Sequence, residues 1–149
     1  MTNPETAQDL KTRKEKLVET LSLFPDPQER LTYILEQARS MPALENSLKV
    51  KEFIVEGCQS QLWLVPRFEA GRCHYATDSD AVITKGIAGL LTELYSGAEP
   101  GEILANEPDF LAEVGITQHL TPNRRNGLSN VWKKIQSFAS ACAEETTRN

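Results

Sequence analysis

The segment 55–63 holds the residue type and setting best suited to chemistry, a cysteine in a short polar turn between two apolar runs. Cys58 directly follows Gly57, and a glycine lets the backbone bend sharply and leaves space beside the sulfur atom. Strand-like segments on both sides would fix the ends of the turn while its tip stays accessible to solvent. Because a reacting thiol must be reached by its partner, this setting predicts that Cys58 is a presented nucleophile.

The polar neighbours of this cysteine would act on the charge of its sulfur. They are Glu56, Gln59, Ser60 and Gln61. The amides of Gln59 and Gln61 are hydrogen-bond donors for a sulfur anion, whereas the carboxylate of Glu56 disfavours a second negative charge nearby. The segment contains no base that would deprotonate the thiol, so the residues alone leave a reactive role and a packing role both open.

The remaining cysteines offer a weaker case for chemistry. Cys73 falls in a predicted strand and Cys142 on the apolar stripe of the last predicted helix, so packing accounts for both. Zinc accepts cysteine and histidine ligands, and four residues could supply them. These are Cys58, Cys73, His74 and His119. Because no two of the cysteines stand at the close spacing of a zinc motif, we expect no metal site.

Known catalytic motifs are missing from the sequence. His119 could act as a base for a cysteine nucleophile, but a histidine in a connecting segment more often caps or bridges structure. Asp78 and Asp80 precede a predicted helix and fit N-capping better than paired-carboxylate catalysis. There is neither a glycine-rich phosphate loop after a strand nor a Gly-x-Ser-x-Gly elbow. The residues alone predict a small domain with one presented thiol.

The bulk properties bound the class of protein. The length of 149 residues suits a single domain over 1–149, in which we expect flexible tails at 1–8 and 143–149. The net charge of −5 argues against a general nucleic-acid binder, because phosphate affinity depends on clustered Lys and Arg. No apolar run approaches the ~20 residues that cross a bilayer, and the first residues lack an apolar signal core. With three widely spaced cysteines and no disulfide framework, we expect a cytoplasmic setting.

Apolar residues at helical spacing predict four main helices, and Pro108 and Gly115 bound a shorter one. The four cover about 8–22, 27–40, 81–96 and 122–142. Asp26 as an N-cap and Pro27 as a first-position proline predict where the second helix begins. Gly86 and Gly89 inside the third helix each cost ~1 kcal/mol relative to alanine, which we interpret as close approach of another backbone.

Three short runs rich in strand-forming residues predict an antiparallel meander. They are 52–55, 62–65 and 72–77. Pro66 cannot donate to a ladder, so its strand should face an edge or a bulge there. The predicted fold class is α+β, with a small antiparallel three-stranded sheet flanked by helices.

Three blocks of sequence resemble the SufE family, the sulfur-acceptor partners of cysteine desulfurases. The first is Gly-Cys-Gln-Ser-Gln-Leu-Trp at 57–63. The second is Asp-Ser-Asp-Ala at 78–81 with Ile83, Lys85 and Gly86, and the third is Thr-Gln-His-Leu-Thr-Pro at 117–122 with Arg124, Gly127 and Leu128. The resemblance runs from about Leu17 to Ala139 and implies the fold that this family shares with IscU-type scaffolds.

The resemblance also implies a mechanism. A desulfurase, SufS-like or CsdA-like, takes sulfur from free cysteine and leaves a persulfide on its own cysteine. The thiolate of Cys58 would attack the outer sulfur, in the manner of thiol–disulfide exchange, and pass it to an iron–sulfur scaffold complex. By clearing the persulfide, the acceptor stimulates the enzyme. The chain is then an accessory protein without its own cofactor, since pyridoxal phosphate belongs to the desulfurase.

Further residues receive roles from the same resemblance. Arg124 would contact the desulfurase or order its active-site loop, and His119 would line the same face. Asp80 would anchor the cysteine loop by capping, with Gly86 allowing close packing beneath it. Structural roles for His119 and Asp80 stay equally open. In such folds the unloaded cysteine can lie in an apolar cavity and swing out on docking.

Two other functions are compatible with the sequence. An IscU-like iron–sulfur scaffold needs about three cysteine-type ligands around one cluster, whereas only Cys58 lies in a suitable loop. A regulatory module could bind a desulfurase while its cysteine is incidental. Replacing Cys58 by serine separates this module from a sulfur acceptor.

Overall fold

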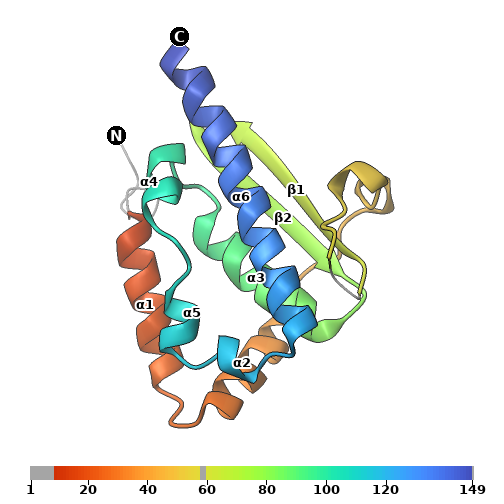
Figure 1. Cartoon of the computed structure of the whole chain (residues 1–149), viewed down its shortest axis with the longest axis vertical. Helices are drawn as coiled ribbons and strands as arrows, with labels where there is room; N and C mark the ends of the chain where they lie inside the picture. The colour runs from red at the N-terminus through yellow and green to blue at the C-terminus, as the bar shows by residue number, and fades with distance from the viewer. Residues whose placement is uncertain (1–8, 58–59, 149) are drawn as a thin grey trace.

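The computed structural model of the protein describes residues 9–57 and 60–148. These residues form six α-helices, three short 3-10 helices and a two-stranded sheet, joined by turns and connecting segments (Figure 1). The helices are α1 (Leu10–Ser22), α2 (Pro27–Ser40), α3 (Val82–Tyr95), α4 (Pro100–Ala105), α5 (Phe110–Glu113) and α6 (Pro122–Arg148). The 3-10 helices are η1 (Asn46–Leu48), η2 (Lys51–Phe53) and η3 (Thr117–His119), and the strands are β1 (Leu62–Glu69) and β2 (Arg72–Ser79). The α+β class is confirmed.

The first two helices begin where an aspartate satisfies a free amide of the first turn. Asp9 Oδ1 accepts from the N–H of Thr12 at 2.7 Å, and Asp26 Oδ1 accepts from the N–H of Gln28 at 3.0 Å. Pro27 has no amide to satisfy and stands at the first position of α2. The start predicted at Asp26 is confirmed.

The two strands form a hairpin. They pair antiparallel from Leu62 opposite Ser79 to Glu69 opposite Arg72. The chain reverses at the turn between Glu69 and Arg72, where Gly71 has a φ of +77°. One end of this hairpin therefore carries a tight turn, and the other end carries the cysteine loop.

The third strand predicted over 52–55 is wrong. Lys51–Phe53 forms η2, and only one isolated bridge, Ile54 to Trp63, joins this segment to β1. Just before η2, the ammonium of Lys49 contacts the carboxylate of Asp78 at 3.2 Å. This anchor lies at the loop end of the hairpin, where the segment meets β1 at the single bridge of Ile54.

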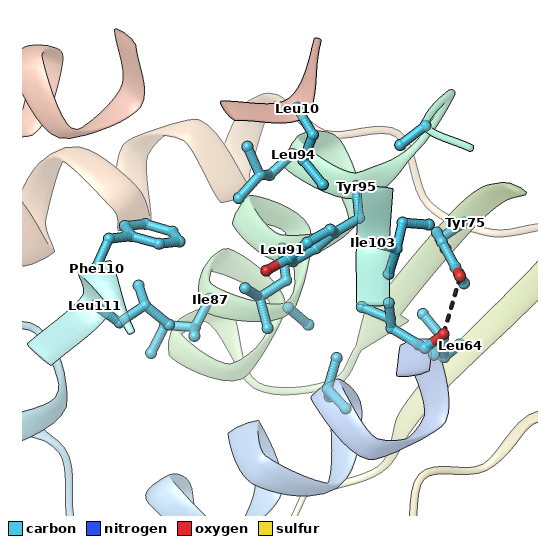
Figure 2. Packing of buried hydrophobic residues seen from close by; sticks show 14 of the residues in the cluster. Leu10, Leu64, Tyr75, Ile87, Leu91, Leu94, Tyr95, Ile103, Phe110 and Leu111 are labelled. Atoms are coloured by element: carbon cyan, nitrogen blue, oxygen red, sulfur yellow. Dashed lines mark hydrogen bonds between the residues drawn. The ribbon is translucent and has the colours of Figure 1, made fainter. Parts of the chain in front are cut away.

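Helix α6 crosses the hairpin and covers the core (Figure 1). The hydroxyl of Tyr75 on β2 donates to the carbonyl of Ile135 on α6 at 3.0 Å, which ties the sheet to this helix (Figure 2). The core beside it is built on α3, whose Ile87, Leu91 and Tyr95 are buried. These residues pack among side chains of the hairpin, α4 and α5.

The glycines of α3 lie where another element comes close. A Cβ on Gly86 would stand 3.1 Å from the carbonyl oxygen of Ile34 and 3.3 Å from the Cβ of Ala38, both on α2. The predicted close approach of a backbone is confirmed. The prediction that Gly86 packs beneath the cysteine loop is wrong, because Gly86 faces α2. At Gly89 the same space is taken by the side chain of Met41.

Two further features of the helices differ from the sequence prediction. Helix α3 begins after Ala81, which makes no side-chain cap, so neither Asp78 nor Asp80 caps it. Helix α4 was not predicted from the sequence, although Glu99 and Glu102 form a capping box there. Helix α6 extends to Arg148, and the flexibility expected for the tail at 143–149 stays a prediction. Of the helices in the described chain, none is both long enough and apolar enough to cross a membrane.

Candidate functional site

The cysteine loop joins the bridge at Ile54 to the start of β1. Cys58 and Gln59, the predicted acceptor and one predicted support residue, lie outside the described residues. The two stems of the loop, Glu56–Gly57 and Ser60–Gln61, are described, and their contacts define the site. At the base of the loop, directly next to the two stems, the N–H of Val55 donates to the carbonyl of Leu62 at 2.8 Å.

The second stem is held by the segment that follows β2. Asp80 Oδ1 accepts from the N–H of Gln61 at 3.0 Å, and the N–H of Asp80 donates to the carbonyl of Gln61 at 3.2 Å. The hydroxyl of Ser79 donates to the same carbonyl at 2.6 Å. Asp80 therefore contacts the loop through Gln61 directly and not as a helix cap. Ser79, which belongs to the Asp-Ser-Asp block at 78–80, has the same partner.

The first stem is held by α6. Asn130 Nδ2 donates to the carbonyl of Glu56 at 2.7 Å. Gly57 has a φ of +89°, and a Cβ built on it would collide with the same amide nitrogen. Sequence reasoning missed Asn130, because no local signal marks a helix residue that contacts a loop 74 positions earlier.

The carboxylate of Asp78 is buried next to Ser79 and Asp80, the two residues that hold the second stem. Asp78 is 3% exposed. Its oxygens accept from Ser79 N at 2.9 Å, Leu44 N at 3.0 Å, Lys49 Nζ at 3.2 Å and Lys85 Nζ at 3.3 Å. Burial acts to raise the pKa of Asp78, but these donors outweigh burial and hold the pKa below its usual value. The contacts assign Asp78 a structural role that joins the chain before η2 to α3.

A small pocket opens beside Ser60, between α3 and α6. Its volume is about 30 Å³, which is enough for one or two atoms the size of a water molecule. Leu62, Ile87 and Val131 contribute apolar surface to its wall. Arg124 borders the pocket and donates from Nη1 to Thr84 Oγ1 at 3.1 Å. His119 is exposed in η3 and does not line the pocket, so the structure does not bring it together with Arg124 there.

A wider hollow of about 760 Å³ borders the first stem. Its walls come from η2, the stem and α6. The residues that line it are Lys51, Glu52, Ile54, Glu56, Gly57, Asn130, Lys133 and Lys134. The cysteine loop thus stands between a small, partly apolar pocket on its Ser60 side and a broad polar hollow on its Glu56 side.

The other cysteines lie at the far end of the hairpin. Cys73 pairs with Phe68, which is six positions along β1 from Leu62, or ~20 Å at the rise of a strand. Both Cys73 and Cys142 are buried, and burial raises the pKa of each thiol, that of Cys73 to about 11. Within the described residues, no group of three or more His, Cys, Asp or Glu side chains is arranged to hold a metal ion.

Comparison with known proteins places the chain in a family. The chain belongs to the SufE family, whose model, described as an Fe-S metabolism associated domain, matches residues 15–139. It is 37% identical over 144 residues to SufE-like protein 1, chloroplastic/mitochondrial, of Arabidopsis thaliana. It is 34% identical over 126 residues to an uncharacterized SufE-like protein of Synechocystis sp.. The resemblance inferred from the three sequence blocks is confirmed.

The matches differ in how much of each protein they cover. The Arabidopsis match takes in 92% of this chain but only 39% of that protein, and the Synechocystis match takes in 85% of this chain and 79% of that one. A solved structure of a hypothetical protein from Thermus thermophilus superposes with a TM-score of 0.73. It is 23% identical and covers 89% of this chain and 96% of its own, which supports the fold alone.

Proposed function

We propose that this protein is the sulfur-acceptor partner of a cysteine desulfurase and takes persulfide sulfur on Cys58. The observation that carries the proposal is the match of 15–139 to the SufE family, a domain associated with Fe–S metabolism. Within that match, the cysteine loop is tied at both stems and stands beside a pocket bordered by Arg124. The protein is an accessory of the desulfurase and of iron–sulfur cluster assembly.

The proposed step is a sulfur exchange without net oxidation. The thiolate of Cys58 attacks the outer sulfur of the enzyme's persulfide, and a new S–S bond forms as the enzyme's S–S bond breaks. The leaving group is the enzyme's cysteine thiolate, which takes up the proton that Cys58 released. The rate depends on the thiolate fraction, on the leaving group and on access, so the acceptor needs no catalytic base beside it. Clearing the persulfide frees the enzyme for another turnover.

The surroundings of the loop fit the needs of such an acceptor. The pocket beside Ser60 has room for one or two atoms, and the apolar part of its wall, from Leu62, Ile87 and Val131, suits the sulfur of an unloaded thiol. Arg124 at its border carries a positive charge that favours an anionic sulfur. Its proposed contact with the desulfurase uses the part of the guanidinium that Thr84 leaves open. The role of His119 stays a prediction, at an exposed position.

The partner is proposed from the family. A desulfurase of the SufS or CsdA kind supplies the persulfide and its pyridoxal phosphate, and an iron–sulfur scaffold complex receives the sulfur. The cytoplasmic setting stays a prediction, since the name of the Arabidopsis relative assigns that protein to chloroplasts and mitochondria.

The geometry argues against an iron–sulfur scaffold built from the three cysteines. Cysteine ligands of one cluster must lie within a few ångströms of its iron atoms. Cys73 lies ~20 Å along the strands from the base of the loop that carries Cys58. Cys142 is buried in the same core cluster as Cys73. A shared cluster would require the hairpin to open.

Mass spectrometry after incubation with a desulfurase and cysteine tests the proposal. We expect wild-type protein to gain the mass of one sulfur atom on the peptide that contains Cys58, and to stimulate alanine production. Cys58→Ser should lose both effects, because serine cannot form a persulfide. The matched control is Cys142→Ser, which removes a buried thiol of the core and should keep both effects.

Two outcomes would contradict the proposal. Stimulation that survives in Cys58→Ser would show a regulatory binding module without transfer. Visible cluster absorbance after anaerobic reconstitution of wild type, lost in Cys58→Ser, would favour the scaffold.

A further inference from the structure

The two stems of the cysteine loop are held in different ways. Three hydrogen bonds hold the second stem, and all come from Ser79 and Asp80, at the end of β2 and directly after it. The side-chain contact that the structure records for the first stem comes from Asn130 on α6, 74 residues away. The position of the first stem therefore depends on the placement of a distant helix.

Asn130 contacts both residues of the peptide that joins Glu56 to Gly57. The amide nitrogen of Asn130 donates to the carbonyl of Glu56 at 2.7 Å. The same nitrogen occupies the space that a Cβ on Gly57 would need. At a φ of +89°, Gly57 has a conformation that other residues rarely adopt. The bond and the missing Cβ together restrict the conformation of the peptide that directly precedes Cys58.

Asn130 also lies in an open part of the protein surface. It lines the hollow beside the first stem together with Lys133, one turn further along α6. Asn130 is half-buried, whereas Lys133 and Lys134 are exposed. A protein seated in this hollow would meet α6 and the stem at the same place.

We propose that Asn130 is a positioning residue for sulfur transfer, which sets the direction of the Cys58 loop through the carbonyl of Glu56. It does not touch the transferred sulfur. Its part in transfer rests on the proposed function, whereas its effect on the loop does not. Because reacting atoms must be aligned as well as close, loss of the contact should lower the transfer rate more than it weakens docking.

Alkylation of the free protein by iodoacetamide tests the effect on the loop. Asn130→Ala should change the rate at Cys58 about three- to tenfold, the range expected for one hydrogen bond, and we expect an increase. Asn130→Leu keeps about the size of the side chain and adds no charge but loses the amide donor, and it should shift the rate in the same direction. The matched control is Asn126→Ala, an exposed asparagine one turn earlier on α6. Rates for Asn130→Ala and Asn126→Ala that agree within twofold would overturn the proposal.

A double-mutant cycle adds a readout that a general loss of stability would not move. Gly57→Ala alone forces the new Cβ against Asn130, and its effect on alkylation should shrink at least threefold when Asn130→Ala has removed the obstacle. With Asn126→Ala the two effects should multiply. Independent effects in the Gly57–Asn130 pair as well would contradict the proposed contact.

Steady-state kinetics with a desulfurase tests the part in transfer. With this protein as the varied acceptor, Asn130→Ala should lower kcat about three- to tenfold and leave KM within twofold. A raised KM with unchanged kcat would make Asn130 a docking residue and overturn the positioning role. If wild-type protein takes up no sulfur, the proposed function fails, and the alkylation rates still decide the effect of Asn130 on the loop.

Discussion

The two ends of the hairpin differ in burial and in what holds them in place. At the turn end, Cys73 is fully buried in an apolar core, and burial raises the pKa of its thiol to about 11. At the loop end, the stem residues Glu56, Gly57 and Gln61 are exposed and polar. They are held by hydrogen bonds to their backbone, not by apolar packing.

This difference teaches that one hairpin can bury a thiol at one end and carry exposed polar stems at the other. The turn end gains stability from apolar burial, which disfavours a thiolate. The loop end uses side-chain hydrogen bonds to backbone groups, which hold the described stems at the surface. We therefore expect Cys58 and Cys73 to differ in reactivity although the residue type is the same.

The largest expected contrast is in thiol labelling. A rise in pKa from 9.0 to about 11 lowers the thiolate population of Cys73 roughly 100-fold at neutral pH, and burial slows the reagent further. We expect iodoacetamide to label Cys58 at least ~100-fold faster than Cys73 in the native protein, as measured by peptide mass spectrometry. In denaturant the rates should converge. Equal labelling in the native state would remove the distinction between the two ends.

The next largest effect is expected at Asp78, the buried carboxylate behind the loop. Asp78→Ala leaves Lys49 and Lys85 without their anion, and it should lower the free energy of unfolding by about 3 kcal/mol in urea titrations. Asp80→Ala is the matched control, because Asp80 is exposed and its loss should cost less than ~1 kcal/mol. Equal losses would mean that burial does not distinguish the two carboxylates.

The same carboxylate predicts a dependence of stability on pH. The pKa of Asp78 is lower in the folded protein than in the unfolded chain, so the folded state favours the ionised form. Its contribution is fully present above the unfolded pKa, ~3.9, and is lost as pH falls through the folded value. The difference in unfolding free energy between wild type and Asp78→Ala should therefore shrink below about pH 4. A constant difference down to pH 2 would contradict this assignment.

A smaller effect is expected at the bond that ties the hairpin to α6. Tyr75→Phe removes the hydroxyl that donates to the carbonyl of Ile135, and it should lower the free energy of unfolding by about 1 kcal/mol. The side chain of Tyr33 is only half-buried, so Tyr33→Phe is the control and should cost less. If the two variants unfold at the same urea concentration, the buried bond contributes nothing to the turn end.

Local features of the fold were predictable because neighbouring residues decide them. The start of α2 follows from Asp26 and Pro27, and the end of α3 follows from Gly97, whose φ is +84°. The strand predicted over 52–55 was wrong because strand pairing depends on partners far away in the chain. Its residues favour a strand, but in the fold Lys51–Phe53 forms η2 and one isolated bridge, Ile54 to Trp63, joins the segment to β1.

For the candidate site, the amino-acid sequence by itself determined the polar loop around Cys58, the nearby Asp80 and the family. Only the tertiary structure decided that Asp80 contacts Gln61 instead of capping α3, that Gly86 faces α2, and that Asn130 holds the first stem. The physical reason is distance along the chain. Spacing of three or four residues encodes a helix face, whereas a contact over 74 residues depends on how α6 packs across the hairpin.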